Sequence, residues 1–202
     1  VGKERILAKS RISALIFSDI ILTSAQRQRH KKNQILITFL LRSFYRSNLA
    51  NETCPLQMVG LFIEKGPVVQ VRSTGDPQEV LKDRDRSISW DGPLVVLVNE
   101  LSASASEILA AAMQDYKRAI VLGSKQTYGK GTVQNLLDLN QWLRNNDMGD
   151  MGALKITTQK YYRVNGGSTQ LEGVKSDVVM PGRYAYLEVG EREYDNPLPY
   201  DK

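Results

Sequence analysis

An α/β fold is predicted by three features that follow one another between residues 94 and 123. An apolar run, Leu94–Val98, comes directly after Gly92-Pro93 and favours a strand buried on both faces. Beyond a short turn, four apolar residues recur at helical spacing and predict one buried helix face: Ile108, Leu109, Ala112 and Met113. A second apolar run, 119–123, follows at once. The order strand, helix, strand predicts an α/β core.

The predicted helix begins with a serine-rich segment, Ser102-Ala-Ser-Ala-Ser-Glu107. Ser104 and Glu107 fit the S-x-x-E spacing of a capping box. A residue at this position meets unpaired backbone N–H groups and the positive end of the helix dipole, which together stabilise an alkoxide or an oxyanion. Roughly nine in ten such patterns only cap a helix. The spacing alone therefore leaves both a cap and a nucleophile open.

A catalytic serine needs a base, and the composition favours a lysine. His30, the single histidine, lies in a basic run, and the chain has one cysteine, so neither a Ser-His-Asp triad nor a zinc site is favoured. Lys130 stands between Gly129 and Gly131, and a lysine in an apolar pocket can act as a general base. Taken alone, Gly-Lys-Gly is more typical of a surface turn. The phosphate-loop spacing is not met, because Gly131 follows the lysine.

In combination, these motifs resemble a known family. The segment 102–107, then Asp115, then Tyr128-Gly-Lys-Gly-Thr-Val-Gln134 are similar to the signature of the C-terminal processing peptidases, particularly their tail-specific branch. The resemblance covers roughly residues 58–202. It implies a crotonase-like (ClpP/crotonase) core of strands and packed helices, no cofactor or metal, and a location in the periplasm or cell envelope. The chain starts without a signal-peptide pattern.

The resemblance also implies roles for single residues. Ser104 would be the nucleophile, Lys130 the general base and Gln134 the group that orients the lysine amine. The backbone N–H of Ala105 would be one oxyanion donor. Asp115 matches an acidic position that supports the site, although an ordinary exposed helix carboxylate explains it equally well. Substrates would be proteins with apolar C-termini bound as an added strand, with the PDZ domain or adaptor supplied elsewhere. No residue is assigned to substrate binding.

Residues 1–57 differ from the rest of the chain. They hold 10 Lys/Arg and 3 Asp/Glu, a net charge of +7, whereas the remainder holds 17 and 19, a net charge of −2. No glycine occurs between Gly2 and Gly60, and the Asn/Gly-rich segment that gives the family its second oxyanion donor is not recognisable. We hypothesise that the reading frame or the gene is altered upstream of about Met58. A nucleic-acid arm is not expected, because no aromatic residues interleave the charges.

The chain is accordingly divided into three parts: an atypical basic part, 1–57, a Ser/Lys peptidase core, 58–182, and a surface tail, 183–202. An active serine endopeptidase is the first functional interpretation. A catalytically inactive remnant that at most binds peptides is the alternative, and an acyl-transfer or CoA-binding enzyme of the same superfold is a third.

Further elements are predicted as a helix end at 58–63, strands at 67–72, 88–90, 133–139 and 154–164, a hairpin or loop at 74–85, a turn at 165–167 and extended chain at 169–180.

Overall fold

The computed structural model describes residues 36–39, 53–141 and 149–202. One four-stranded sheet is parallel throughout and has the order β1-β4-β5-β8. Its strands are β1 (Leu36–Phe39), β4 (Leu94–Val98), β5 (Ile120–Gly123) and β8 (Val178–Val179). Parallel neighbours need a crossover connection, and the chain between β4 and β5 supplies one as a helix.

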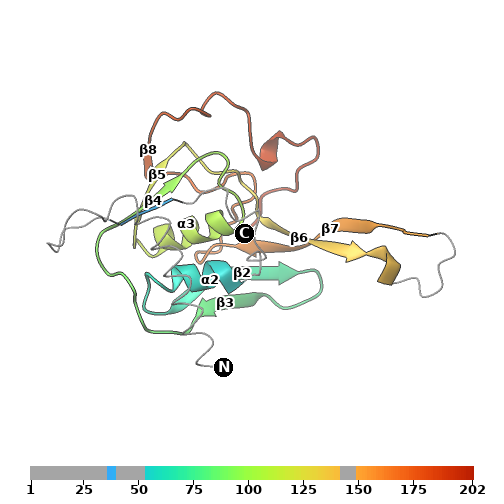
Figure 1. The fold of residues 1–202 in the computed structure, drawn as a ribbon, viewed down its shortest axis with the longest axis horizontal. Helices are drawn as coiled ribbons and strands as arrows, with labels where there is room; N and C mark the ends of the chain where they lie inside the picture. The colour runs from blue at the N-terminus through green and yellow to red at the C-terminus, as the bar shows by residue number, and fades with distance from the viewer. Residues whose placement is uncertain (1–35, 40–52, 142–148) are drawn as a thin grey trace.

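The second four-stranded sheet is antiparallel and has the order β3-β2-β7-β6. It consists of β2 (Gly66–Ser73), β3 (Glu79–Asp83), β6 (Thr132–Asp138) and β7 (Ala153–Tyr162). The β6–β7 hairpin projects away from the rest of the molecule (Figure 1). Among the described residues, a short 3₁₀ helix, η2 (Leu139–Gln141), follows β6, and another, η3 (Glu191–Glu193), lies near the C-terminus.

Two α-helices are described, α2 (Thr53–Val59) and α3 (Ala105–Asp115). Helix α3 lies between the parallel sheet on one side and α2 with the β2–β3 hairpin on the other (Figure 1). The main hydrophobic core forms around it, from buried residues of α2, α3, β2, β4 and β5 and the turn after α2. Leu109 and Met113 of α3 are almost completely buried there. No helix in the described ranges is long and apolar enough to span a bilayer.

The apolar run of β4 predicted a strand buried on both faces, and this prediction is wrong. Leu94, Val96 and Val98 are buried, whereas Val95 and Leu97 are only half-buried. On the neighbouring strand, Ile120 is 53% exposed. Helix α3 packs against one face of the parallel sheet, and the described residues leave the opposite face partly open.

Most of the other predicted elements are confirmed. The helix ends at Val59, and the β2–β3 hairpin, β5, β6, β7 and the turn after β7 form as expected. The short strand predicted at Ile88–Trp90 is wrong, because the N–H groups of Ser89 and Trp90 both donate to the carbonyl of Leu61. Within the extended segment 169–180 only Val178–Val179 is a strand, and β1 lies within the apolar run at 35–44. Residues 12–22 are also apolar enough for a core strand or a helix, and they fall outside the described residues.

Leu109→Ala should lower the free energy of unfolding by about 2–5 kcal/mol, because it opens a cavity in the closed core around α3. Leu109 is 1% exposed, whereas Leu136 on the projecting hairpin is 70% exposed. Leu136→Ala is the matched control and should change stability by no more than about 0.5 kcal/mol. Urea denaturation of both variants measures the difference, and equal losses would contradict this packing.

Candidate active site

Ser104 occupies a strained turn between strand β4 and helix α3. Its backbone has φ +55° and ψ −112°, a conformation that residues other than glycine rarely adopt. Such strain persists only where the surroundings fix it, and it clusters at functional sites. A nucleophilic serine on a sharp strand-to-helix turn is presented in this way in other hydrolases.

The three serines of the helix start differ in accessibility. Ser102 and Ser106 are buried, at 2% and 6% exposure, whereas Ser104 is half-buried. The Ser102 hydroxyl is also engaged with Asn99, whose backbone N–H donates to it over 3.1 Å. Ser104 therefore has the accessibility that a nucleophile needs.

The backbone N–H of Ala105 is suited to bind an oxyanion. Ala105 is the first residue of α3, and within the described part of the chain its N–H donates to no acceptor. The first N–H groups of a helix lack partners within the helix and carry the positive end of its dipole. This donor lies directly beside Ser104, as the predicted oxyanion position requires.

The carboxylate of Glu107 connects the helix start to the lysine loop. Its side chain is fully buried, and its Oε2 accepts the N–H of Ser104 over 2.8 Å and the N–H of Lys130 over 3.1 Å. Its Oε1 accepts the hydroxyl of Thr127 over 2.6 Å and the N–H of Gly129 over 2.7 Å. One carboxylate thus fixes the backbone of both predicted catalytic residues.

The protonation of Glu107 is set by two opposing effects. Burial is the larger effect, because it removes water from the carboxylate, and the net pKa of Glu107 is raised from 4.5 to about 7. The hydrogen bonds from Thr127, Gly129, Ser104 and Lys130 act in the opposite direction and favour the charged form. The charge on this group therefore changes within the range of neutral to mildly acidic pH.

Lys130 is half-buried, and its amine contacts Gln134, the residue predicted to orient it. Nζ donates to Oε1 of Gln134 over 3.4 Å. The carbonyl of Lys130 is held from the other side by the hydroxyls of Tyr161 and Thr169. Among the described residues, the side chains of Ser104 and Lys130 form no hydrogen bond with each other. The structure thus links these two residues through their backbones and pairs the amine with Gln134.

Asp115 lies at the opposite end of α3 from Ser104, about 15 Å away along the helix axis. Its carboxylate forms a bidentate pair with Arg163, over 2.5 and 3.2 Å, and also accepts Asn165 Nδ2 over 3.0 Å. The Asp115 side chain is only 8% exposed. The interpretation of Asp115 as an ordinary exposed carboxylate is therefore wrong, and its structural effect is to tie α3 to the turn after β7.

Two residues with structural roles in the site were not assigned such roles from the sequence. Glu107 was noted only as the partner in the capping box, although the S-x-x-E spacing did place a carboxylate there. Tyr161 is fully buried, and its hydroxyl reaches the carbonyls of both Lys130 and Ser104. This burial is typical of an aromatic strand residue that packs inside the protein.

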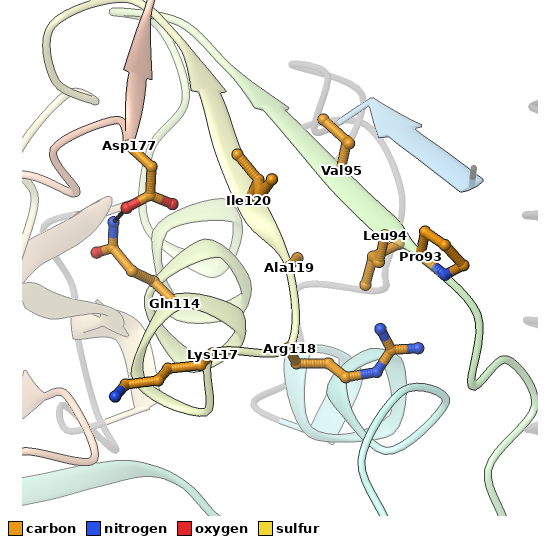
Figure 2. Close-up of a pocket in the computed structure, with 9 residues that line it drawn as sticks. All are labelled: Pro93, Leu94, Val95, Gln114, Lys117, Arg118, Ala119, Ile120 and Asp177. Atoms are coloured by element: carbon orange, nitrogen blue, oxygen red, sulfur yellow. Dashed lines mark hydrogen bonds between the residues drawn. The ribbon is translucent and has the colours of Figure 1, made fainter.

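A hollow of about 480 Å³ lies at the C-terminal end of α3, away from the helix start that carries Ser104. Figure 2 shows side chains of β4, β5 and the helix end facing it, with a hydrogen bond of 2.8 Å from Gln114 to Asp177 across one side. Ser104 and Lys130 do not line it. The hollow is therefore separate from the predicted catalytic residues.

Comparison with known proteins identifies the class as an α/β peptidase core. A model of Peptidase family S41 matches residues 55–180, more than half of the chain. The chain belongs to peptidase family S41. The predicted family and the predicted α/β peptidase core are both confirmed.

Several relatives are markedly longer than this chain. The chain is 50% identical over 143 residues to the tail-specific protease of Haemophilus influenzae, covering 71% of the chain and 20% of that protein. It is 35% identical over 145 residues to a carboxy-terminal-processing protease of Bartonella bacilliformis, covering 68% and 31%. The photosystem II D1 C-terminal processing protease has a similar structure, with a TM-score of 0.53 and 29% identity over 63% of this chain and 30% of that one.

The stability of the protein should fall between about pH 4.5 and pH 7 because of Glu107. The folded state holds the Glu107 proton more tightly than the unfolded chain, so the contribution is complete below about pH 4.5 and is lost as the pH rises through 7. The expected loss is about 3 kcal/mol. Glu107→Gln should flatten this slope, whereas Glu172→Gln at an exposed position should keep it. Urea denaturation across this pH range measures both slopes, and an unchanged slope in Glu107→Gln would contradict the assignment.

Asp115→Ala should lower the free energy of unfolding by roughly 2–4 kcal/mol, because it leaves the Arg163 guanidinium partly buried without its partner. Asp76→Ala, at an exposed turn, is the control and should cost at most about 0.5 kcal/mol. A double-mutant cycle with Arg163→Met should recover part of the loss. Additive losses in that cycle would show that the pair contributes no coupling energy.

Proposed function

We propose that this chain is the catalytic core of a serine endopeptidase that uses Ser104 and Lys130 as its catalytic pair. The observation that carries the proposal is the turn at Ser104. A half-buried serine with a strained backbone stands beside the N–H of Ala105, which has no acceptor within the described residues, and Glu107 ties this turn to the loop of Lys130. Membership of family S41 supports the same chemistry.

In the proposed reaction, the neutral amine of Lys130 takes the proton of the Ser104 hydroxyl while Oγ attacks the scissile carbonyl. The N–H of Ala105 stabilises the developing oxyanion. Collapse of the tetrahedral intermediate expels the amine of the leaving peptide, and Lys130 passes to this amine the proton that it took from Ser104. Water then hydrolyses the acyl-enzyme with Lys130 again acting as the base. Gln134 holds the amine between these steps.

We propose protein substrates with apolar, unstructured C-terminal tails, in keeping with the names of the relatives. Recognition of the tail would rest with a PDZ domain or an adaptor outside the three proposed parts, 1–57, 58–182 and 183–202. We place the protein in the periplasm or cell envelope.

An inactive remnant that binds peptides is the second candidate. The observation that favours it is the position of the Lys130 amine, which contacts Gln134 and forms no hydrogen bond with Ser104 within the described residues. The segment expected to supply the second oxyanion donor precedes Met58 and lies largely outside the described residues. Loss of one oxyanion donor typically lowers the rate by about 100- to 1000-fold.

Cleavage of an unfolded reporter protein with an apolar C-terminal tail tests the proposal. Ser104→Ala and Lys130→Ala should each lower kcat/KM to below about one thousandth of the parent value, because each removes a participant in the chemical step. Ser87→Ala and Lys82→Ala, at exposed positions in and just after β3, are the matched controls and should retain activity. A parent chain that folds but does not cleave the reporter would favour the inactive remnant.

A further inference from the structure

The last part of the chain, residues 190–201, runs along the loop that carries Lys130. The backbone N–H of Glu191 donates to the carbonyl of Tyr128 over 3.0 Å. The hydroxyls of Tyr194 and Tyr128 are hydrogen-bonded over 2.8 Å, and Arg192 donates to the side chain of Gln126 over 3.2 Å. We call residues 190–201 the C-terminal strap and residues 126–131 the lysine loop. The strap was expected to be only a surface tail, and it contacts the lysine loop through both backbone and side chains.

Gln170 connects the lysine loop to the strap from inside the molecule. Its side chain is completely buried, at 0% exposure. Its Oε1 accepts the N–H of Gly131 over 2.9 Å, and its Nε2 donates to the carbonyl of Leu198 over 3.0 Å. A buried amide is costly unless its polar atoms are hydrogen-bonded, so both partners are needed to keep it there. Gly131, one of these partners, is adjacent to Lys130.

The far end of the strap is fixed to the antiparallel sheet. Asp201 Oδ2 accepts Lys160 Nζ and Arg72 Nη2, each over 3.1 Å, and the hydroxyl of Tyr162 over 3.0 Å. These three partners belong to the central strands β2 and β7. The strap is therefore attached to the rigid sheet at one end and to the lysine loop at the other.

The lysine loop needs such external contacts, because it has little regular structure of its own. Only an isolated bridge at Gln126 interrupts its irregular backbone before β6 begins at Thr132. Gly129 adopts φ +89°, and the glycines on both sides of Lys130 give the unfolded loop more freedom to lose. Glu107 holds one side of the loop, at Thr127, Gly129 and Lys130. The strap and Gln170 hold the other side, at Gln126, Tyr128 and Gly131.

We propose that the C-terminal strap, acting partly through Gln170, is a positioning element for the catalytic lysine. The strap fixes the backbone of the lysine loop and with it the position from which the Lys130 amine reaches Ser104. Gln170 is a positioning residue, since it contacts neither Ser104 nor the amine. The catalytic consequence rests on the proposed peptidase function, whereas the structural part, the ordering of residues 126–131 by the strap, does not.

Two variants loosen the strap by different routes, and each has a matched control. Glu191→Pro removes the N–H that donates to Tyr128, at the first position of η3, where a proline is tolerated. Glu191→Ala removes the same side chain and keeps the N–H. Gln170→Leu removes both hydrogen bonds of the buried amide, and Gln159→Leu removes a half-buried amide on β7 that donates to Ser73.

Hydrogen exchange of residues 126–131 and the kinetics of reporter cleavage are measured on all four variants. Glu191→Pro and Gln170→Leu should speed exchange of the lysine loop by about tenfold or more, with unchanged exchange in the β2–β3 hairpin. In both, kcat should fall by roughly 10- to 100-fold with KM within about twofold, because a displaced catalytic group lowers the rate without weakening substrate binding. Glu191→Ala and Gln159→Leu should match the parent.

Hydrogen exchange of the lysine loop in Glu191→Pro that matches the parent would overturn the proposal, and this variant decides the matter even if Gln170→Leu fails to fold. A loosened loop with unchanged kcat would overturn the positioning role. A parent chain without peptidase activity would disprove the proposed function, while the exchange rates would still show whether the strap orders the loop. The two failures are therefore distinguishable.

Discussion

The buried carboxylate of Glu107 fixes the start of α3 and the lysine loop relative to each other, and the rest of the site depends on this contact. A carboxylate loses most of its hydration when it is buried, and only hydrogen-bond donors close around it offset that cost. Here four donors from Ser104, Thr127, Gly129 and Lys130 surround the two oxygens. The start of α3 and the lysine loop are more than 20 residues apart in sequence. Each segment supplies donors that the other does not, so the carboxylate has all four hydrogen bonds only when both segments are in place.

The same carboxylate helps to maintain the strained backbone of Ser104. A positive φ at a residue with a side chain costs of order 1–3 kcal/mol, so it persists only where neighbouring contacts oppose relaxation. The N–H of Ser104 is held by Glu107, and its carbonyl accepts the N–H groups of Glu107 and Ile108 at the start of the helix. Behind the turn, β4 is fixed in the middle of the parallel sheet and α3 in the core. The strain is thus confined to the residue whose side chain is left accessible.

The sequence predicted the features that depend on neighbouring residues and missed those that depend on distant ones. The strand–helix–strand order and the helix start at Ser104 are local patterns, and the contact between Lys130 and Gln134, which the family resemblance implied, joins residues four positions apart. The partners of Glu107 at Thr127 and Gly129, the pairing of Asp115 with Arg163 and the link from Gln170 to Leu198 join residues 20 to 48 positions apart. Such contacts follow from how the elements pack, and no periodicity in one chain reveals them. The strand predicted at Ile88–Trp90 is wrong for the same reason, because the N–H groups of Ser89 and Trp90 donate to the carbonyl of the distant Leu61.

The way the lysine is held determines what motion catalysis would require. The backbone of Lys130 is fixed on three sides: its N–H is bound to Glu107, its carbonyl to Tyr161 and Thr169, and the following N–H to Gln170. The four-carbon side chain beyond it is flexible, and its contact with Gln134, at 3.4 Å, is long for a hydrogen bond. In the proposed mechanism the amine leaves Gln134 for Ser104, and with the backbone held this movement falls to the side chain, whose rotation is much faster than rearrangement of a loop. A fixed backbone with a flexible side chain suits the base of the proposed reaction, which accepts a proton from Ser104 and later delivers it to the leaving group.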